Sequence, residues 1–223
     1  MVTRRRVNFG VFRLYFMEQT VQKSKLELVR DGLKSSMGYM EYRALVSNLA
    51  LEGRSTGSIE SQELNEYTRL NDQRMKRLDK TIKINVDSQA KIKGMDKKTI
   101  WLVLTESWCG DAAQTLPVMN KIAELNSNIS LRLVLRDRNM ELMEQFLSHG
   151  AMAIPKLISI DGTTGEVIGE WGSRPSFAAK MAQDYKNKYG KLTAEFKQDL
   201  QLWYNKDKGQ NTVNDLLSLL FLE

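Results

Sequence analysis

The chain has 223 residues, of which 42% are hydrophobic and 27% charged, with a formal net charge of +6. This composition permits a buried core in one or two domains, and no apolar run approaches the roughly 18 residues of a membrane span. Much of the positive excess comes from four arginines within residues 1–16, so we expect no nucleic-acid partner and no membrane partner.

Residues 1–16 resemble a secretory signal peptide only weakly. Arg4-Arg5-Arg6 precedes an apolar stretch, but Asn8 and Arg13 interrupt it and no Ala-x-Ala-like site follows. We expect a disordered arm or a mis-assigned start, with Met17 as the alternative initiator. The single cysteine permits no intramolecular disulfide, which fits a reducing compartment. We therefore expect a cytoplasmic protein, with export as the minority alternative.

Residues 17–94 are predicted to be a helical extension that packs on the following domain. Apolar residues at three- and four-residue spacing predict helices over 39–51 and 61–81, separated by a short Ser- and Gly-containing turn. Such a helical hairpin cannot bury its apolar stripes alone. Residues 85–98 are expected to connect it to the next unit.

The main domain is expected over residues 95–190, where the apolar pattern changes to that of an α/β unit. The predicted elements are a buried strand at 99–105, a helix at 111–125, a strand at 131–135, a helix at 139–149, a strand at 156–160 and its hairpin partner at 165–171. The first strands should be parallel and the last pair antiparallel. Residues 191–223 should form C-terminal helices, with the apolar residues 216–222 folded back onto the domain.

The candidate site is Trp108-Cys109-Gly110-Asp111-Ala112, at the turn from the buried strand to a helix. Backbone N–H groups at a helix N-terminus favour a thiolate, so Cys109 is predicted to lie exposed there with a functional thiol. The carboxylate of Asp111 opposes that effect.

These residues resemble the Trp-Cys-Gly-Pro-Cys site of thioredoxins, and the similarity covers about residues 95–190. Pro117 matches the proline that kinks the active-site helix, and Ile154-Pro155 matches the cis-proline opposite the reactive cysteine. The resemblance implies a thioredoxin-like mixed sheet flanked by helices. It also implies a substrate groove formed by Trp108, Gly110, Asp111, Ile154 and Pro155.

A narrower similarity joins residues 106–114 with residues 71–77 of the extension. Together they resemble a bacterial thioredoxin-like family with a helical N-terminal extension and a single-cysteine WCGDA site. The family's function is poorly defined, so the likeness bears on architecture more than on substrate.

Two departures from thioredoxins limit the chemistry. Ala112 stands at the resolving cysteine and Val103 at the buried acid, so no dithiol cycle is available within the chain. One hypothesis is a monothiol oxidoreductase that acts on a protein or small-thiol partner, with no cofactor except glutathione as an external thiol. The alternative is a non-catalytic thioredoxin-fold module that binds a protein.

Other candidates receive structural interpretations. His149 is expected at the end of a helix, and one Cys and one His cannot assemble a zinc site, so no metal is expected. Trp171 is a second-rank groove residue, and Arg74 and Arg77 are expected on a solvated helix face with their stems packed below.

Overall fold

The computed structural model describes residues 23–221, so the predicted arm at residues 1–16 lies outside the described part. The helices are α1 (Lys25–Lys34), α2 (Tyr39–Glu52), α3 (Gln62–Thr81), α4 (Val86–Lys93), α5 (Gly110–Ala123), η1 (Arg136–Arg138), α6 (Met140–Glu144), α7 (Ser176–Tyr189), α8 (Ala194–Asp207) and α9 (Gln210–Leu220). The strands are β1 (Thr99–Thr105), β2 (Ile129–Leu135), β3 (Lys156–Asp161) and β4 (Val167–Gly172).

The four strands form one mixed sheet in the order β2-β1-β3-β4. β1 pairs with β2 in parallel and with β3 antiparallel, and β3 pairs with β4 antiparallel. β1 is central and buried on both faces, as its continuous apolar sequence predicts. The predicted strand directions are confirmed, and the mixed sheet with helices around it is a thioredoxin-like α/β fold.

The helical pair before the sheet forms close to its predicted bounds. α2 ends at Gly53, whose φ of 64° is easily adopted by glycine, and the Ser61 side chain caps α3. α3 packs on both α2 and α5, so the pair covers α5, whose N-cap is Cys109. α1 was not among the predicted helices, and residues 85–98 contain α4, capped by Asn85, where only a connection was expected.

The predicted helix over 139–149 is wrong beyond Glu144. Phe146 turns into the core with 1% of its surface exposed, and backbone bonds between Ser148 and Ala151 close a tight turn. His149 lies in that turn with a φ of 50°, so it does not end a helix as expected. The turn directs the chain into Ile154 and Pro155 at the start of β3.

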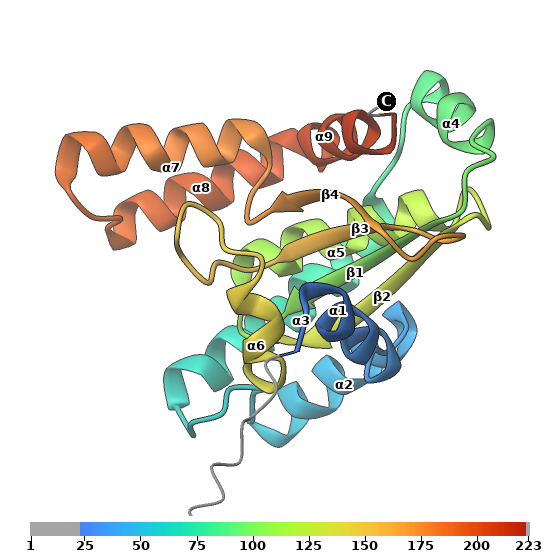
Figure 1. Ribbon diagram of the computed structural model, residues 1–223. Helices are drawn as coiled ribbons and strands as arrows, with labels where there is room; N and C mark the ends of the chain where they lie inside the picture. Colours follow the sequence, from blue (N-terminus) through green and yellow to red (C-terminus); the bar gives the residue numbers. More distant parts are fainter. Residues whose placement is uncertain (1–22, 222–223) are drawn as a thin grey trace, which may run out of the picture.

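Helices lie on both faces of the sheet, with α1 in front of the strands and α5 behind them (Figure 1). The main hydrophobic core extends from α1 through the sheet to Leu216 and Leu219 of α9, which confirms for these residues the prediction that the apolar tail folds back. α7 and α8 lie alongside each other and project past the sheet (Figure 1). Within residues 23–221, no helix is long and apolar enough to cross a membrane.

Candidate functional site

Cys109 occupies the turn between β1 and α5, at the N-cap of the helix. The N–H of Ala112 donates to Sγ at 3.5 Å, and Sγ donates to the carbonyl oxygen of Ile154 at 3.3 Å. The Ile154–Pro155 peptide bond is cis. The structure therefore brings Cys109, Gly110 and Asp111 together with Ile154 and Pro155 at one end of the sheet.

The thiol of Cys109 is buried, and the prediction that it lies exposed at the helix N-terminus is wrong. Only 7% of the residue is exposed, and Ile154 opposite it is exposed to the same extent. Burial, followed by the negative charge of Asp111, raises the pKa of Cys109 to about 12, although two backbone N–H groups act in the other direction. Desolvation therefore outweighs the helix terminus, and the resting side chain is a neutral thiol at pH 7.

Asp111 joins the turn to the C-terminal helices. Its side chain is 11% exposed and forms an ion pair with Arg174, Nη2 to Oδ2, at 2.8 Å. The Tyr204 hydroxyl of α8 donates to Oδ1 at 2.9 Å. Burial raises the pKa of the Asp111 carboxyl and of the Tyr204 hydroxyl. Sequence reasoning missed Arg174 and Tyr204, because both lie outside any motif and more than 60 residues beyond Asp111.

The backbone just before Trp108 is fixed by a buried polar network. The Asn71 side chain donates to the Ser107 carbonyl at 2.9 Å, and the Ser107 and Thr68 hydroxyls are 2.8 Å apart. The Thr56 hydroxyl and the Asp137 N–H both donate to the Glu106 carboxylate, which is 1% exposed. Burial raises the pKa of Glu106. Glu106, Ser107 and Asn71 all belong to the sequence segments that carry the narrower resemblance, but no role was predicted for them.

Two arginines lie close to the turn. The Arg136 guanidinium stands over the Trp108 ring at 5.0 Å from its centroid, a cation–π distance. Arg74 donates to the Asn71 amide oxygen, and its Nη1 is 3.4 Å from where a Cβ on Gly110 would lie. Arg74 is half-buried and Arg77 is exposed, which fits the expected solvated face with packed stems.

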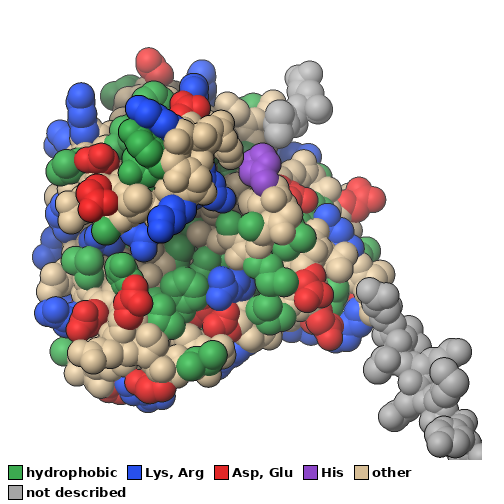
Figure 2. Space-filling view, turned by 90° about the vertical axis from the view of Figure 1, so that its left-hand side faces the viewer, with side chains coloured by type: hydrophobic (Ala, Val, Ile, Leu, Met, Phe, Trp, Pro, Cys, Tyr) green, Lys and Arg blue, Asp and Glu red, His purple; other side chains and the backbone are tan. Residues whose placement is uncertain are grey.

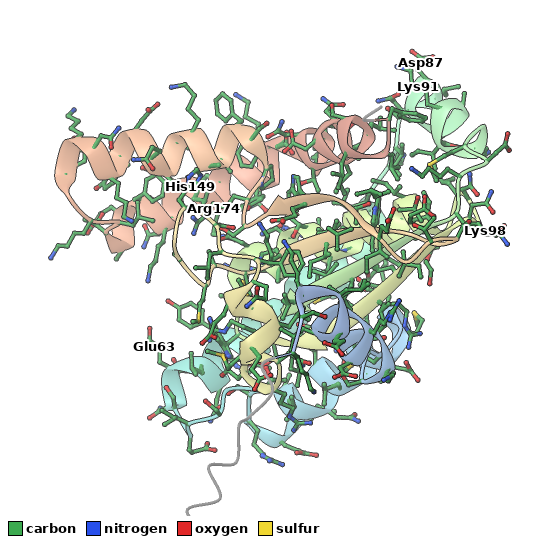
Figure 3. The ribbon with its side chains drawn as sticks, in the orientation of Figure 1. Glu63, Asp87, Lys91, Lys98, His149 and Arg174 are labelled. Carbon is green, nitrogen blue, oxygen red and sulfur yellow. The ribbon has the colours of Figure 1, made fainter. Side chains whose placement is uncertain are left out.

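The end of the sheet that carries Cys109 is hollowed, with hydrophobic side chains gathered in the hollow and Lys or Arg side chains beside it (Figure 2). Arg174 and His149 both lie at this end of the sheet (Figure 3). The Trp171 indole donates to Asp215 of α9 at 3.2 Å. Among the residues that the structure describes, no group of three or more His, Cys, Asp or Glu side chains could hold a metal ion.

A mixed sheet with a cysteine at the N-terminus of the following helix, opposite an Ile-Pro segment, defines a thioredoxin-like protein. A family model described as Thioredoxin matches residues 57–186, which is more than half of the chain. The protein belongs to this thioredoxin family. The matched residues include α3 as well as the sheet, so the match extends into the predicted helical extension.

Solved structures support the fold. A protein of unknown function from Pseudomonas aeruginosa is similar with a TM-score of 0.56 and 14% identity, over 86% of this chain and 95% of its own. An HIV epitope-scaffold protein is similar with a TM-score of 0.51 and 16% identity, over 82% of this chain and 98% of its own. No curated protein matches the sequence.

The raised pKa of Cys109 predicts how the rate of its alkylation depends on pH. Because the thiolate is the nucleophile, the iodoacetamide labelling rate should rise about tenfold per pH unit from pH 7 to pH 10, without a plateau. Mass measurement of the intact native protein follows the reaction. A plateau beginning near or below pH 8.5, the ordinary cysteine range, would show that the thiol is already accessible to water in the resting protein.

Proposed function

We propose that this protein works as a monothiol thioredoxin-like redox protein through Cys109, in a reducing compartment such as the cytoplasm. The observation that carries the proposal is the place of the sulfur. It lies at the α5 N-terminus with the Ala112 N–H aimed at it, across from Ile154 and the cis bond to Pro155. A peptide or small thiol binds on the side of the site formed by Trp108, Gly110 and Asp111.

The proposed chemistry is one exchange step and its reversal by a second thiol. The Cys109 thiolate attacks one sulfur of an external disulfide, which forms a mixed disulfide with Cys109 and releases the other half as a thiol. An external thiol such as glutathione then attacks the mixed disulfide, which returns Cys109 to the thiol and leaves the partner bonded to the attacking sulfur. Ala112 holds no sulfur, so release depends on that second molecule.

Cys109→Ser tests this function. The native protein incubated with oxidised glutathione should gain one glutathione adduct by intact mass, and reduced glutathione should remove it. Cys109→Ser should gain none, while its thermal unfolding stays close to that of the native protein because serine is nearly isosteric. A native protein that takes up no adduct after hours at pH 8, while its unfolded form does, would remove the basis for a redox role.

The burial of Cys109 favours a second candidate, a non-catalytic thioredoxin-fold module that binds a protein partner. In that case the thiol is a small core side chain that contacts the Ile154 carbonyl. Binding to any partner found for the protein should then be the same for Cys109→Ser and for the native chain. Loss of partner binding in Cys109→Ser would favour the thiol function instead.

A further inference from the structure

The hairpin formed by α7 and α8 has an apolar core of its own. Ala178 and Ala182 of α7 pack with Phe196, Leu200 and Tyr204 of α8 in a cluster separate from the main core. In contrast, α9 contributes to the main core. Elements that share an internal cluster move as a unit more easily than elements whose apolar face is built into the central core.

Side-chain hydrogen bonds contribute to holding α8 on the body of the protein. Tyr204 bonds Asp111, the Gln114 amide donates to Gln201 at 2.9 Å, and Arg77 donates to Asn205 at 2.8 Å. Each such bond is a weak net tie, because the same groups bond water when the contact opens. The polar seam is therefore suited to repeated opening.

The seam between α3 and α8 is also incompletely filled. A cavity of about 260 Å³ lies there. Its lining consists of Arg77, Leu78, Thr81, Ile82, Tyr204, Asn205 and Lys208. Arg77, Thr81, Asn205 and Lys208 are exposed, so this space opens to solvent along the contact between α3 and α8.

The hairpin is attached to the fold at two irregular points. The chain leaves α8 through Lys208 and Gly209, which have φ values of 54° and 82°, and it enters α7 after Gly172, whose φ is 123°. At the base, the Ser176 N–H and hydroxyl donate to Asp215 of α9 at 2.7 Å and 2.8 Å. The hydrogen bonds of Ser176 to Asp215 hold the base of the hairpin, and α7 and α8 can rotate about that base.

We propose that residues 174–208 form a lid that closes over the Cys109 site through Arg174 and Tyr204 and opens as a unit while the rest of the fold remains intact. Both residues hold Asp111, two positions from the thiol, so opening removes both partners of that carboxylate and admits water and reactants to Sγ. As a gate for a redox thiol, the lid rests on the proposed function. As a movement, it is testable with Cys109 as a passive reporter.

The first test needs no variant. Iodoacetamide labelling of Cys109 in the full chain is measured across urea concentrations below the unfolding transition, and global unfolding is followed by circular dichroism in the same buffer. If the lid opens locally, the logarithm of the labelling rate rises with urea concentration with a slope, in energy units, well below the m value of global unfolding. A slope equal to the global m value overturns the proposal, and so does labelling at the free-thiol rate without urea.

The second test separates the lid contact from the hairpin's own stability. Tyr204→Phe keeps the buried ring but removes the bond to Asp111, and the labelling rate should rise about tenfold. Tyr185→Phe is the matched control, because its hydroxyl pairs with Thr193 inside the hairpin at 2.8 Å. Its labelling rate should stay within about twofold of the native rate, as the Asp111 contact is intact. Equal rates for the two variants overturn the lid.

The lid and the redox function can fail separately. If Cys109 is labelled through local opening with a small urea slope but no glutathione adduct forms, the lid is supported and the redox role is removed. An adduct that forms on the native protein, with a labelling slope equal to the global m value, does the reverse.

Discussion

Replacing Gly172 by alanine should lower the free energy of unfolding by about 3 kcal/mol or more, because a Cβ at this position has neither the backbone conformation nor the space it needs. Gly172 has a φ of 123°, and a Cβ built there would clash with the carbonyl oxygen of Pro155. The last residue of β4 thus passes directly against the segment that faces Cys109. Relieving the clash must shift Pro155, so labelling of Cys109 should also become faster.

The matched control is Gly165→Ala, in the turn between β3 and β4. Gly165 also has a positive φ, 78°, but a Cβ there meets nothing within 4 Å. The variant should therefore show only the conformational penalty of about 1 kcal/mol, with unchanged Cys109 labelling. Urea unfolding of both variants measures the difference. Equal losses of stability would mean that the contact with Pro155 relaxes freely and does not hold the site together.

The sheet was predictable because its signals are local. β1 is a continuous run of apolar residues, and the turn at Gly162 between two such segments indicates a hairpin. The pentapeptide around Cys109 fixed the position of α5. α4 was missed because it is only eight residues long and amphipathic character is weak in so short a segment. The helix at 139–149 was overextended because the apolar spacing continues to Phe146, although the backbone turns there to bury that ring.

The state of the thiol was not predictable, because it depends on residues distant in the sequence. A helix N-terminus favours a thiolate, but only in a site open to water. Arg174 and Tyr204 close the site on Asp111, and neither carries a local signal for that contact. The pattern around Cys109 thus indicated the position of the sulfur, whereas its burial depends on tertiary packing in the main core, including the Ile154 segment opposite it.

Arg43→Met should lower the free energy of unfolding by roughly 3–5 kcal/mol, because it removes one partner of a buried ion pair between α2 and α3. Arg43 is 7% exposed, and its guanidinium lies 3.2 Å from Asp72 Oδ1 and 3.0 Å from Asp79 Oδ2. Methionine keeps an apolar stem of similar length, so the loss reports mainly the unpaired carboxylates. Lys76→Met is the control, because Lys76 also pairs with Asp72 but is 58% exposed. Its effect should be about 1 kcal/mol or less.

The effect of Arg43→Met should depend on pH with a definite sign. Burial acts to raise the pKa of Asp72, but hydrogen bonds from Lys76, Ser47 and Arg43 outweigh it and hold the folded-state pKa below its ordinary value of 3.8. The ionised carboxylate therefore stabilises the fold above its unfolded pKa, and that contribution is lost as the pH falls through the folded pKa. The gap between native protein and Arg43→Met should be full at pH 7 and shrink below about pH 4. In the double variant Arg43→Met/Asp72→Asn the side chain at position 72 is uncharged, so part of the stability lost at pH 7 should be recovered. A double variant no more stable than Arg43→Met would show that Arg43 matters through packing and not through charge.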